Sequence, residues 1–485
     1  MNVVTRFPPS PTGFLHVGSL RTALYNYLFA RHHGGRFILR VEDTDRARCV
    51  EGAVESLIKT MNAMGLDYDE GPTLVNDKII EVGDNGPYVQ SNRSEIYTKY
   101  ALQLVEQGDA YHCFCSKDRL AELRKGQQLA KLPTKYDRTC ASLSKDEIKA
   151  KVDAETSFVI RLKIPDGPVT FKDEIRGSVT IDGSEVDDQV LMKADGFPTY
   201  HLAVVVDDHL MGVTHVIRGE EWISSVPKHV LLYKMLGFEL PTFAHLPLIL
   251  NPDKSKLSKR QGDVAVEDFL DKGYLPEALL NFVALLGFNP SGDQEIYSVQ
   301  ELQDSFNLSG VNKSGAVFDV EKLNWMNGQY IKKLDPEDLL ERARPYAEDV
   351  DDSLLGRILA IEKDRLSFLS EIKDHLDMYT GQPEYDSEIL VWKKADKEDA
   401  LTQLKGVGEA IKSLNDETFE SLELIEGAIK KYIEDNELKN GNVLWPLRVA
   451  LSGAPRSPSP FELAWILGKE ETLNRIKFAT DKLVT

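Results

Sequence analysis

Three groups of residues in this 485-residue chain have types and spacings that suit chemistry. The first is the stretch "RFPPSPTGFLHVGSLRTAL", residues 6–24, in which three prolines and two glycines surround a single histidine, His16. Proline fixes φ and removes a hydrogen-bond donor, whereas glycine permits close approach of the backbone. The composition predicts a rigid loop that a ligand can approach closely.

The loop leads into a helical pattern, and that arrangement favours an anionic ligand. Apolar residues recur at helical spacing after residue 19, and the helix is predicted to end at Gly34–Gly35. A helix N-terminus offers unpaired N–H groups and a partial positive charge, which suit phosphate. We expect Gly18 to leave room for a base or ribose and His16 to donate to a phosphate oxygen. A lone loop histidine is more often structural, so a second motif is needed to support phosphate binding here.

The second group is the basic stretch "NPDKSKLSKRQGD", residues 251–263, which carries Lys254, Lys256, Lys259 and Arg260. In isolation such a run is usually a solvated loop. It directly follows a predicted strand, however, so it is placed to fold over the same sheet edge. Lysines there would neutralise the charge that builds on a leaving pyrophosphate.

The third group consists of cysteines. Cys113 and Cys115 form a C-x-C pair, and Cys140 supplies a distant third thiol. The chain has only four cysteines, which is no disulfide framework and indicates a reducing compartment. Three thiols could contribute to a zinc site, but zinc usually takes four ligands. The alternative is three reduced thiols without a metal.

The elements that must position these groups have the order of an α/β protein. "NVVTRF" (2–7) and "RFILRVEDTD" (36–45) are predicted strands that flank the helix, which makes a βαβ unit and a parallel sheet. Apolar runs in 200–222 are typical of a buried sheet, and "HLPLIL" (245–250) is predicted as another strand after the helix "HVLLYKMLGF". Residues 95–195 combine a helix near "EIYTKYALQLVEQG" with strands such as "SFVIRLKI" and look like an insertion. Helical patterning dominates after about residue 260.

Composition limits the broad class of the protein. The chain is 42% hydrophobic and 28% charged, which is ordinary for a globular protein of about three or four domains. No apolar run reaches the roughly 18 residues of a transmembrane helix, and the N-terminus lacks the pattern of a secretory signal. The net charge of −20 argues only weakly against nucleic acid, because binding needs only a local basic face.

The motifs resemble those of a known enzyme family. "PSPTGFLHVGS" together with "KLSKR" resembles the paired nucleotide-binding motifs of class I aminoacyl-tRNA synthetases. "RFPPSPTGFLHVGSLRTALYNYLFAR", "GGRFILRVEDTDR" and "YHLAVVVDDHLMGVTHVIRGEEW" are similar to segments of the glutamyl-tRNA synthetases of bacterial type. The resemblance follows the motif order through most of residues 1–330 and continues at "LWPLRVALSG".

The resemblance implies an α/β Rossmann-type catalytic domain with an inserted α+β acceptor-binding domain, followed by all-α stem-contact and anticodon-binding domains. The expected bounds are 1–95 and 196–255 for the catalytic halves, 96–195 for the insertion, 256–330 for the KLSKR loop and stem-contact domain, and 331–485 for the anticodon-binding domain.

The implied activity is ATP-dependent attachment of L-glutamate to tRNA-Glu through a glutamyl-adenylate. The partners are ATP with Mg²⁺, L-glutamate and tRNA-Glu, and charging of tRNA-Gln as well stays open. No membrane partner is implied. We expect a cytoplasmic monomer.

By resemblance, His16, Lys256 and Lys259 are the catalytic residues that act on the triphosphate. The implied ATP-binding residues are Pro11, Gly13, His16, Gly18, Ser19 and Lys259, and the implied glutamate-binding residues are Arg6, Ser10, Glu42, Tyr200 and Arg218. Arginine suits carboxylates because its fork binds them bidentately, and a carboxylate such as Glu42 suits the ammonium. Taken alone, Arg6 is a salt bridge at a strand end and Glu42 an exposed acid.

Some relatives carry zinc at the cysteines, with a histidine two residues after the last one. This chain has Ser142 there, and Tyr136 is an alternative fourth ligand, so the metal stays open.

Three rival functions are weaker. A glutaminyl-tRNA synthetase would carry C-terminal β-barrels, whereas this C-terminus is helical in pattern. The shortened relative that glutamylates a modified tRNA base lacks an anticodon domain, so the length argues against it. A catalytically inactive RNA-binding protein conflicts with intact His16, Lys256 and Lys259.

Overall fold

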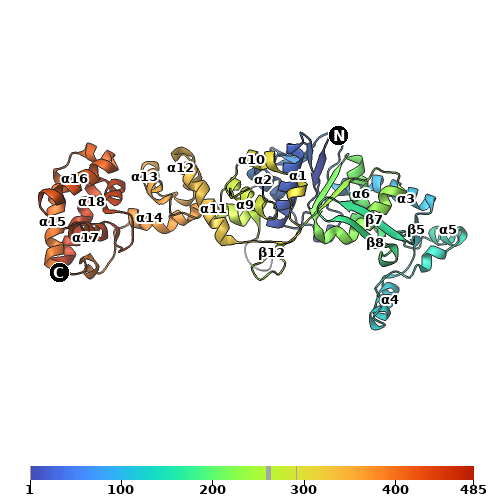
Figure 1. The fold of residues 1–485 in the computed structure, drawn as a ribbon. Coiled ribbons are helices and arrows are strands. Elements are labelled where there is room, and N and C mark those ends of the chain that lie inside the picture. Colours follow the sequence, from blue (N-terminus) through green and yellow to red (C-terminus); the bar gives the residue numbers. More distant parts are fainter. Residues whose placement is uncertain (1, 258–263, 291, 485) are drawn as a thin grey trace. The chain divides into compact units, whose positions relative to one another are not determined.

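The computed structural model describes residues 2–257, 264–290 and 292–484. The chain forms two compact units (Figure 1): residues 1–270 with 276–320, and residues 271–275 with 321–485. Among the described residues, no helix combines the length and the apolar composition that crossing a bilayer requires.

Parallel strands form the centre of the first unit. Strand β1 (Val4–Phe7) pairs in parallel with β2 (Arg36–Leu39), and β10 (His215–Gly219) pairs in parallel with β11 (Thr242–Leu246). The two pairs are adjacent because the N–H of Thr214 donates to the carbonyl of Val4, at 3.0 Å. The hairpin β7 (Pro168–Asp173) and β8 (Gly177–Asp182) extends the sheet beyond β11, where Asp173 is in register with Phe243. The predicted parallel sheet is confirmed.

Helix α1 (Val17–His32) packs against β1 and returns the chain to β2. The predicted end of this helix is confirmed, since Gly34 has a φ of +60°. A Cβ on Gly35 would lie 2.1 Å from the carbonyl oxygen of Val3, so only glycine fits where the chain re-enters the sheet. These glycines fix the βαβ connection.

Two element predictions were wrong in part. Residues Tyr200–Leu210 form helix α6 rather than a strand, and only β10 in the 200–222 stretch is a strand. Helix α6 is buried on nearly all sides, and a helix buried all round has no polar face to reveal its period. The predicted strand 245–250 is divided into β11 and β12 (Ile249–Leu250), with Pro247 between them, because proline cannot donate to a strand ladder.

The segment 95–195 holds both helices and strands, as predicted. Its strands β5 (Ala110–Cys113), β6 (Val159–Leu162) and β9 (Val190–Met192) form a three-stranded antiparallel sheet. Its helices are α3 (Ser94–Gln107), α4 (Lys117–Leu129) and α5 (Lys145–Asp153). The other elements of this unit are α2 (Ala53–Ala63), β3 (Gly71–Val75), β4 (Lys78–Val82), α7 (Val226–Met235), α8 (Val266–Asp271), α9 (Pro276–Leu285), α10 (Val299–Ser305) and β13 (Ala316–Val317).

The regular elements of described residues 321–484 are all helical, as the pattern after residue 260 predicts (Figure 1). They are α11 (Val320–Lys333), α12 (Pro336–Ala343), α13 (Asp352–Glu362), α14 (Ile372–Thr380), α15 (Lys397–Ser413), α16 (Leu422–Asp435), α17 (Asn440–Ser452) and α18 (Pro460–Val484). Their apolar faces bury residues such as Leu404, Ile425 and Leu447 in a core of their own.

Candidate active site

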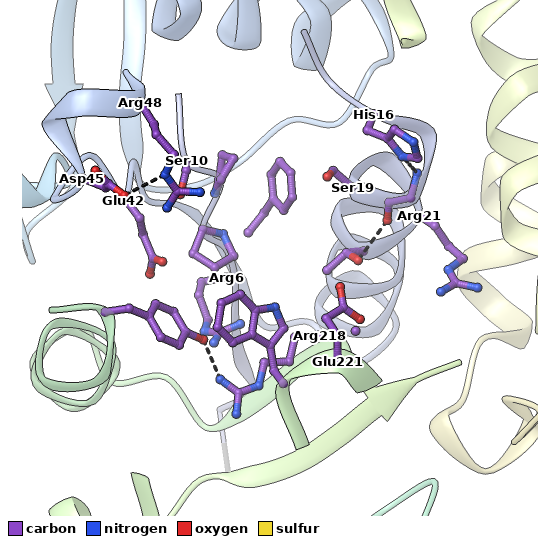
Figure 2. A pocket seen from close by; sticks show the side chains of 18 of the residues that line it. Arg6, Ser10, His16, Ser19, Arg21, Glu42, Asp45, Arg48, Arg218 and Glu221 are labelled. Atoms are coloured by element: carbon purple, nitrogen blue, oxygen red, sulfur yellow. Dashed lines mark hydrogen bonds and ion pairs between the residues drawn. The ribbon is translucent and has the colours of Figure 1, made fainter. Parts of the chain in front are cut away.

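A cavity of about 590 Å³ opens at the carboxyl ends of four parallel strands. Residues that end or follow β1, β2, β10 and β11 line it, which is where open α/β sheets bind ligands. Figure 2 shows Arg6, Ser10 and Glu42 on one side of the cavity and the start of α1, with His16 and Ser19, on the other. The cavity brings together nine of the predicted site residues: Arg6, Ser10, His16, Gly18, Ser19, Glu42, Tyr200, Arg218 and Lys256.

His16 is the N-cap of helix α1. Its Nδ1 accepts the N–H of Gly18 at 2.9 Å, so the proton of the neutral ring sits on Nε2 and makes that atom a donor. A Cβ on Gly18 would lie 3.2 Å from Nδ1 of His16. A side chain at this position would therefore crowd the capping ring of His16, and the expected room for a base or ribose at Gly18 stays a prediction.

The expected supply of unpaired N–H groups at this helix start is not found. The Gly18 N–H is used by the His16 ring, the Val17 N–H donates to the carbonyl of Val264 at 2.9 Å, and the Ser19 and Leu20 N–H groups both donate to the carbonyl of His16. The expectation of free donors was wrong, because the cap and the neighbouring chain satisfy them. The positive end of the helix dipole remains directed at the cavity.

The chain that directly follows the basic motif contacts the loop that carries His16. Residues 264–266 run antiparallel to residues 15–17, with an isolated bridge between His16 and Ala265. Lys256 lines the cavity, and Leu257 is anchored by its N–H to the carbonyl of Ile249, at 3.0 Å. Lys259 lies outside the described residues. Both flanks of segment 258–263 are thus fixed beside the loop that carries His16.

Two predicted residues do not line the cavity. Pro11 is buried and accepts the N–H of Val50 on its carbonyl, at 2.9 Å. Gly13 has a φ of +122° and allows the loop to turn. Both shape the loop from behind the cavity wall.

Arg6 lies fully buried in a balanced charge network. Its Nε and NH2 donate to the two carboxylate oxygens of Asp208, at 3.0 and 3.3 Å. Asp208 also accepts from NH1 of Arg40, at 2.7 Å. Burial opposes ionisation of Asp208, but Arg6 and Arg40 hold its pKa below the ordinary value. The NH1 of Arg6 is buried and has no hydrogen-bond partner among the described residues.

Glu42 faces the cavity from the end of β2. It is buried and accepts from NH2 of Arg40 at 2.9 Å. Burial raises its pKa, and Arg40 acts in the opposite direction. Its N–H donates to the carbonyl of Pro9 at 2.9 Å, which ties this acid to the loop that carries Ser10.

Arg218 has different partners. Its NH1 donates to the hydroxyl of Tyr200 at 2.7 Å, its Nε donates to Nε2 of His245 at 3.1 Å, and its NH2 lies 3.3 Å from Nδ1 of His229. Only 5% of the residue is exposed. It makes no ion pair with any carboxylate of the described residues. Its guanidinium therefore has no counter-charge in direct contact among the described residues.

Sequence reasoning missed several residues of this site. Arg48, Lys193 and Glu221 line the cavity, and Trp222 packs on Tyr200 with ring centroids 4.4 Å apart. Asp208, His229 and His245 lie behind it. The pair "DD" at 207–208 and the histidine in "HLPLIL" were visible, but nothing in their spacing indicates which arginine each would contact.

The three predicted thiols come together in the insertion. The sulfurs of Cys113, Cys115 and Cys140 all lie within 4.8 Å of one another. The hydroxyl of Tyr136 lies 3.2 Å from the sulfur of Cys115 and accepts the N–H of Cys140 at 3.0 Å. Ser142 donates its hydroxyl to the carbonyl of Thr139, at 3.1 Å.

Comparison with known proteins identifies the fold and the family. Residues 2–325 match the catalytic domain of the class I tRNA synthetases (E and Q), and residues 338–480 match an anticodon binding domain. The chain therefore has the class I synthetase fold, in which an α/β catalytic domain precedes a helical anticodon-binding domain.

Its relatives narrow the class. The chain is 47% identical to the glutamate–tRNA ligase of Clostridium botulinum over 99% of this chain and 98% of the relative. It is 45% identical to that of Alkaliphilus metalliredigens over the whole of both chains. A crystal structure of a glutamate–tRNA ligase from Elizabethkingia meningosepticum superposes with a TM-score of 0.90 at 36% identity, over 100% of both chains. The chain belongs to the glutamate–tRNA ligases, ATP-binding enzymes of protein biosynthesis.

Proposed function

We propose that the cavity binds L-glutamate between Arg6, Glu42 and Arg218, binds ATP toward His16, and joins the two as glutamyl-adenylate. The observation that carries this proposal is that one cavity is lined by two buried guanidiniums with unused capacity. Arg6 has an unpaired NH1, and Arg218 has no carboxylate partner among the described residues. Glutamate brings two carboxylates and one ammonium, for which Glu42 is the acceptor. The Elizabethkingia structure is itself a complex with its amino acid.

In the first step an oxygen of the glutamate α-carboxylate attacks the α-phosphorus of ATP. The bond from that phosphorus to the bridging oxygen breaks, and pyrophosphate leaves with the electron pair. The Nε2–H of His16, Lys256 and Lys259 are the donors assigned to the triphosphate, with the dipole of α1 behind them. Mg²⁺ is expected on the phosphates, held mainly by substrate oxygens and water. In the second step the terminal 2′-hydroxyl of the tRNA attacks the carbonyl carbon, and AMP leaves.

The glutamate end is tested with Arg218→Ala. The variant is expected to lower kcat/KM for glutamate by about a hundredfold or more, because a buried charge-assisted hydrogen bond is lost in a site built around it. The melting temperature should change little, since no carboxylate of the described residues is paired with this side chain. Unchanged glutamate kinetics would refute the assignment.

His16 has two roles in this proposal: its Nδ1 caps helix α1, and its Nε2–H donates to the triphosphate. Variants that separate these roles test the phosphate end of the cavity. Asparagine is a good N-cap, so His16→Asn keeps the cap of α1 but removes the Nε2 donor. Its stability should match wild type, whereas kcat/KM for ATP should fall by about tenfold to a hundredfold. His16→Ala should lose about 1 kcal/mol of stability in addition. If asparagine restored both properties, His16 would be only a cap.

The RNA partner is proposed to be tRNA-Glu. Residues 117–138 of the insertion contain seven basic and three acidic residues, in a chain of net charge −20, and this local excess supports contact with an acceptor stem. Attachment of labelled glutamate to tRNA-Glu and tRNA-Gln, assayed side by side, distinguishes the possible specificities. Charging of tRNA-Glu alone would define a discriminating enzyme, and charging of both would require an amidotransferase downstream. Charging of neither would refute the proposal.

We further propose that the enzyme acts as a monomer in the cytoplasm. Sedimentation of the full chain with and without tRNA tests the monomer, and fractionation of source cells tests the location. A dimer at micromolar concentration would contradict the first proposal.

A zinc ion is proposed at Cys113, Cys115 and Cys140. Three converging sulfurs fit the ligand preference of zinc, and the Tyr136 hydroxyl beside Cys115 is the candidate fourth ligand, since Ser142 is turned to Thr139. Bound zinc would tie β5 to the turn at Cys140. Metal analysis of protein purified without chelator tests this, and less than about a tenth of an equivalent would end the proposal.

A further inference from the structure

The hydrogen-bond partners of Arg218 are uncharged, and each imidazole among them is itself hydrogen-bonded to a further side chain. One series of hydrogen bonds runs from Arg218 to His245 and from His245 to the carboxylate of Asp173, so that Asp173 is connected to Arg218 only through the imidazole. Its Oδ2 lies 2.6 Å from Nδ1 of His245, and both side chains are fully buried. Asp173 stands at the end of β7, and His245 stands on the neighbouring β11.

The hydrogen bonds fix where the proton of His245 sits. Oδ1 of Asp173 already accepts the backbone N–H groups of Ile175 and Arg176, at 3.0 and 2.8 Å. Its Oδ2 is also only an acceptor, because the hydrogen bond to His245, together with these backbone N–H groups, holds the pKa of Asp173 below its ordinary value although burial opposes ionisation. The proton must therefore lie on Nδ1 of His245. Its Nε2 then presents a lone pair to the Nε–H of Arg218.

We propose that Asp173 and His245 are positioning residues that aim Arg218 at the substrate carboxylate while leaving its positive charge uncompensated. This inference rests on the proposed role of Arg218 in binding glutamate. A carboxylate placed directly on Arg218 would hold the guanidinium equally well but would compete with the substrate for it. A neutral imidazole supplies direction without charge, and Asp173 supplies the tautomer that makes the imidazole an acceptor.

His229 acts on Arg218 in the same way from helix α7. Its Nδ1 faces NH2 of Arg218 at 3.3 Å, and its Nε2 lies 3.1 Å from Nδ1 of His201. Burial lowers the pKa of His229, and the nearby charges of Arg218 and Lys228 act in the same direction. The ring stays neutral, accepts from Arg218 and donates to His201. Two imidazoles and the Tyr200 hydroxyl thus hold three nitrogens of one guanidinium.

Asp173→Asn tests the role of the tautomer. The amide oxygen must keep the two backbone N–H groups, so the amide NH₂ faces Nδ1 of His245. That ring nitrogen then has to accept, its proton moves to Nε2, and two N–H groups oppose each other between His245 and Arg218. The Kd for glutamate, by calorimetry on the full chain, should rise by about tenfold to a hundredfold, as should its KM in aminoacylation. The KM for ATP should stay within about twofold.

A pair of His245 variants provides a readout that a purely structural role would not move. In His245→Gln the amide oxygen can take the place of Nε2 and accept from Arg218, whereas the shorter side chain of His245→Asn reaches only toward Asp173. Glutamate affinity should be retained within about threefold in the first variant and lost as in Asp173→Asn in the second. Asp182→Asn, an exposed acid at the end of the same hairpin, is the matched control and should bind glutamate as wild type does.

The outcomes separate this inference from the proposed function. If Arg218→Ala loses glutamate affinity but Asp173→Asn and His245→Asn do not, the positioning role is wrong and the site stands. If Arg218→Ala also retains affinity, the assignment of the glutamate site itself is wrong. Should Asp173→Asn fail to fold, the two His245 variants decide, and equal affinities in them would overturn the inference.

Discussion

Two buried arginines face one cavity, but the fold treats their charges in opposite ways. Around Arg6, the guanidiniums of Arg6, Arg40 and Arg93 meet the carboxylates of Glu42, Asp207 and Asp208, three against three. Around Arg218 the direct partners are two imidazoles and a phenol. The first arrangement neutralises the charge within the protein. The second leaves Arg218 without a counter-charge in contact among the described residues, and the proposed function assigns that charge to the substrate.

The difference predicts different roles for the Arg6 half and the Arg218 half of the cavity. A buried ion network contributes to a defined core, and losing one partner strands a charge at high cost. A buried cation without a counter-charge costs stability in the empty enzyme, and binding of an anion relieves that cost. We therefore expect substitutions behind Arg6 to change stability first and substitutions behind Arg218 to change glutamate binding first.

The largest expected effect is on stability and comes from Asp208→Asn. One carboxylate there serves both Arg6 and Arg40, and an amide would leave part of two buried guanidiniums unpaired. The free energy of opening of the catalytic unit should fall by about 3–5 kcal/mol. Asp173→Asn should lose only about 1–3 kcal/mol, because it disturbs hydrogen bonds without stranding a charge directly.

Hydrogen exchange measured in urea on peptides from α6 and β10 reads these free energies within the catalytic unit. Asp182→Asn serves again as the control for a lost surface carboxylate. Equal losses in Asp208→Asn and Asp173→Asn would remove the distinction between the two halves.

The second prediction concerns the choice between glutamate and glutamine. We take Arg218 as the partner of the side-chain carboxylate of glutamate. Glutamine replaces that carboxylate by an amide, which leaves Arg218 without any counter-charge but leaves Arg6 paired with Asp208. Arg218→Ala should therefore reduce the glutamate-over-glutamine ratio of kcat/KM by about a hundredfold, and Arg6→Ala by about tenfold or less. Parallel aminoacylation with the two amino acids measures both ratios. A larger loss in Arg6→Ala would reverse the proposed division of labour.

The sequence predicted more of this site than of its supports. Proline, glycine and histidine in residues 6–24 indicate a ligand loop by their own conformational limits, whereas Arg6, Glu42 and Arg218 were assigned to the site through the family resemblance. The residues behind them could not be predicted. Asp173 meets His245 only because β7 pairs with β11, and residues 168–182 lie inside the stretch that looked like an insertion. Helix α6, which carries Asp208, was predicted as part of a sheet because it is buried all round.

The smallest expected effect is a pH dependence of stability that comes from His201 in the Arg218 half. Burial lowers the pKa of His201 from 6.5 to about 3, with Lys228 and Arg218 acting in the same direction. Because the unfolded chain then binds the proton more tightly than the folded one, this histidine leaves stability intact above about pH 6.5. Stability falls below that pH, by up to about 1.4 kcal/mol per pH unit, or about 2 kcal/mol at pH 5. The folded pKa of Asp208 is lowered below 3.8, so the stability that this carboxylate contributes is lost only in stronger acid. The free energy of unfolding of His201→Gln should therefore rise relative to that of wild type as the pH falls from 7 to 5, as read by the same hydrogen-exchange measurement on α6. If the difference in free energy of unfolding between the two proteins is constant over this range, His201 takes up its proton without cost. The imidazoles around Arg218 would then not be held neutral, and they would not explain why the charge of Arg218 stays uncompensated.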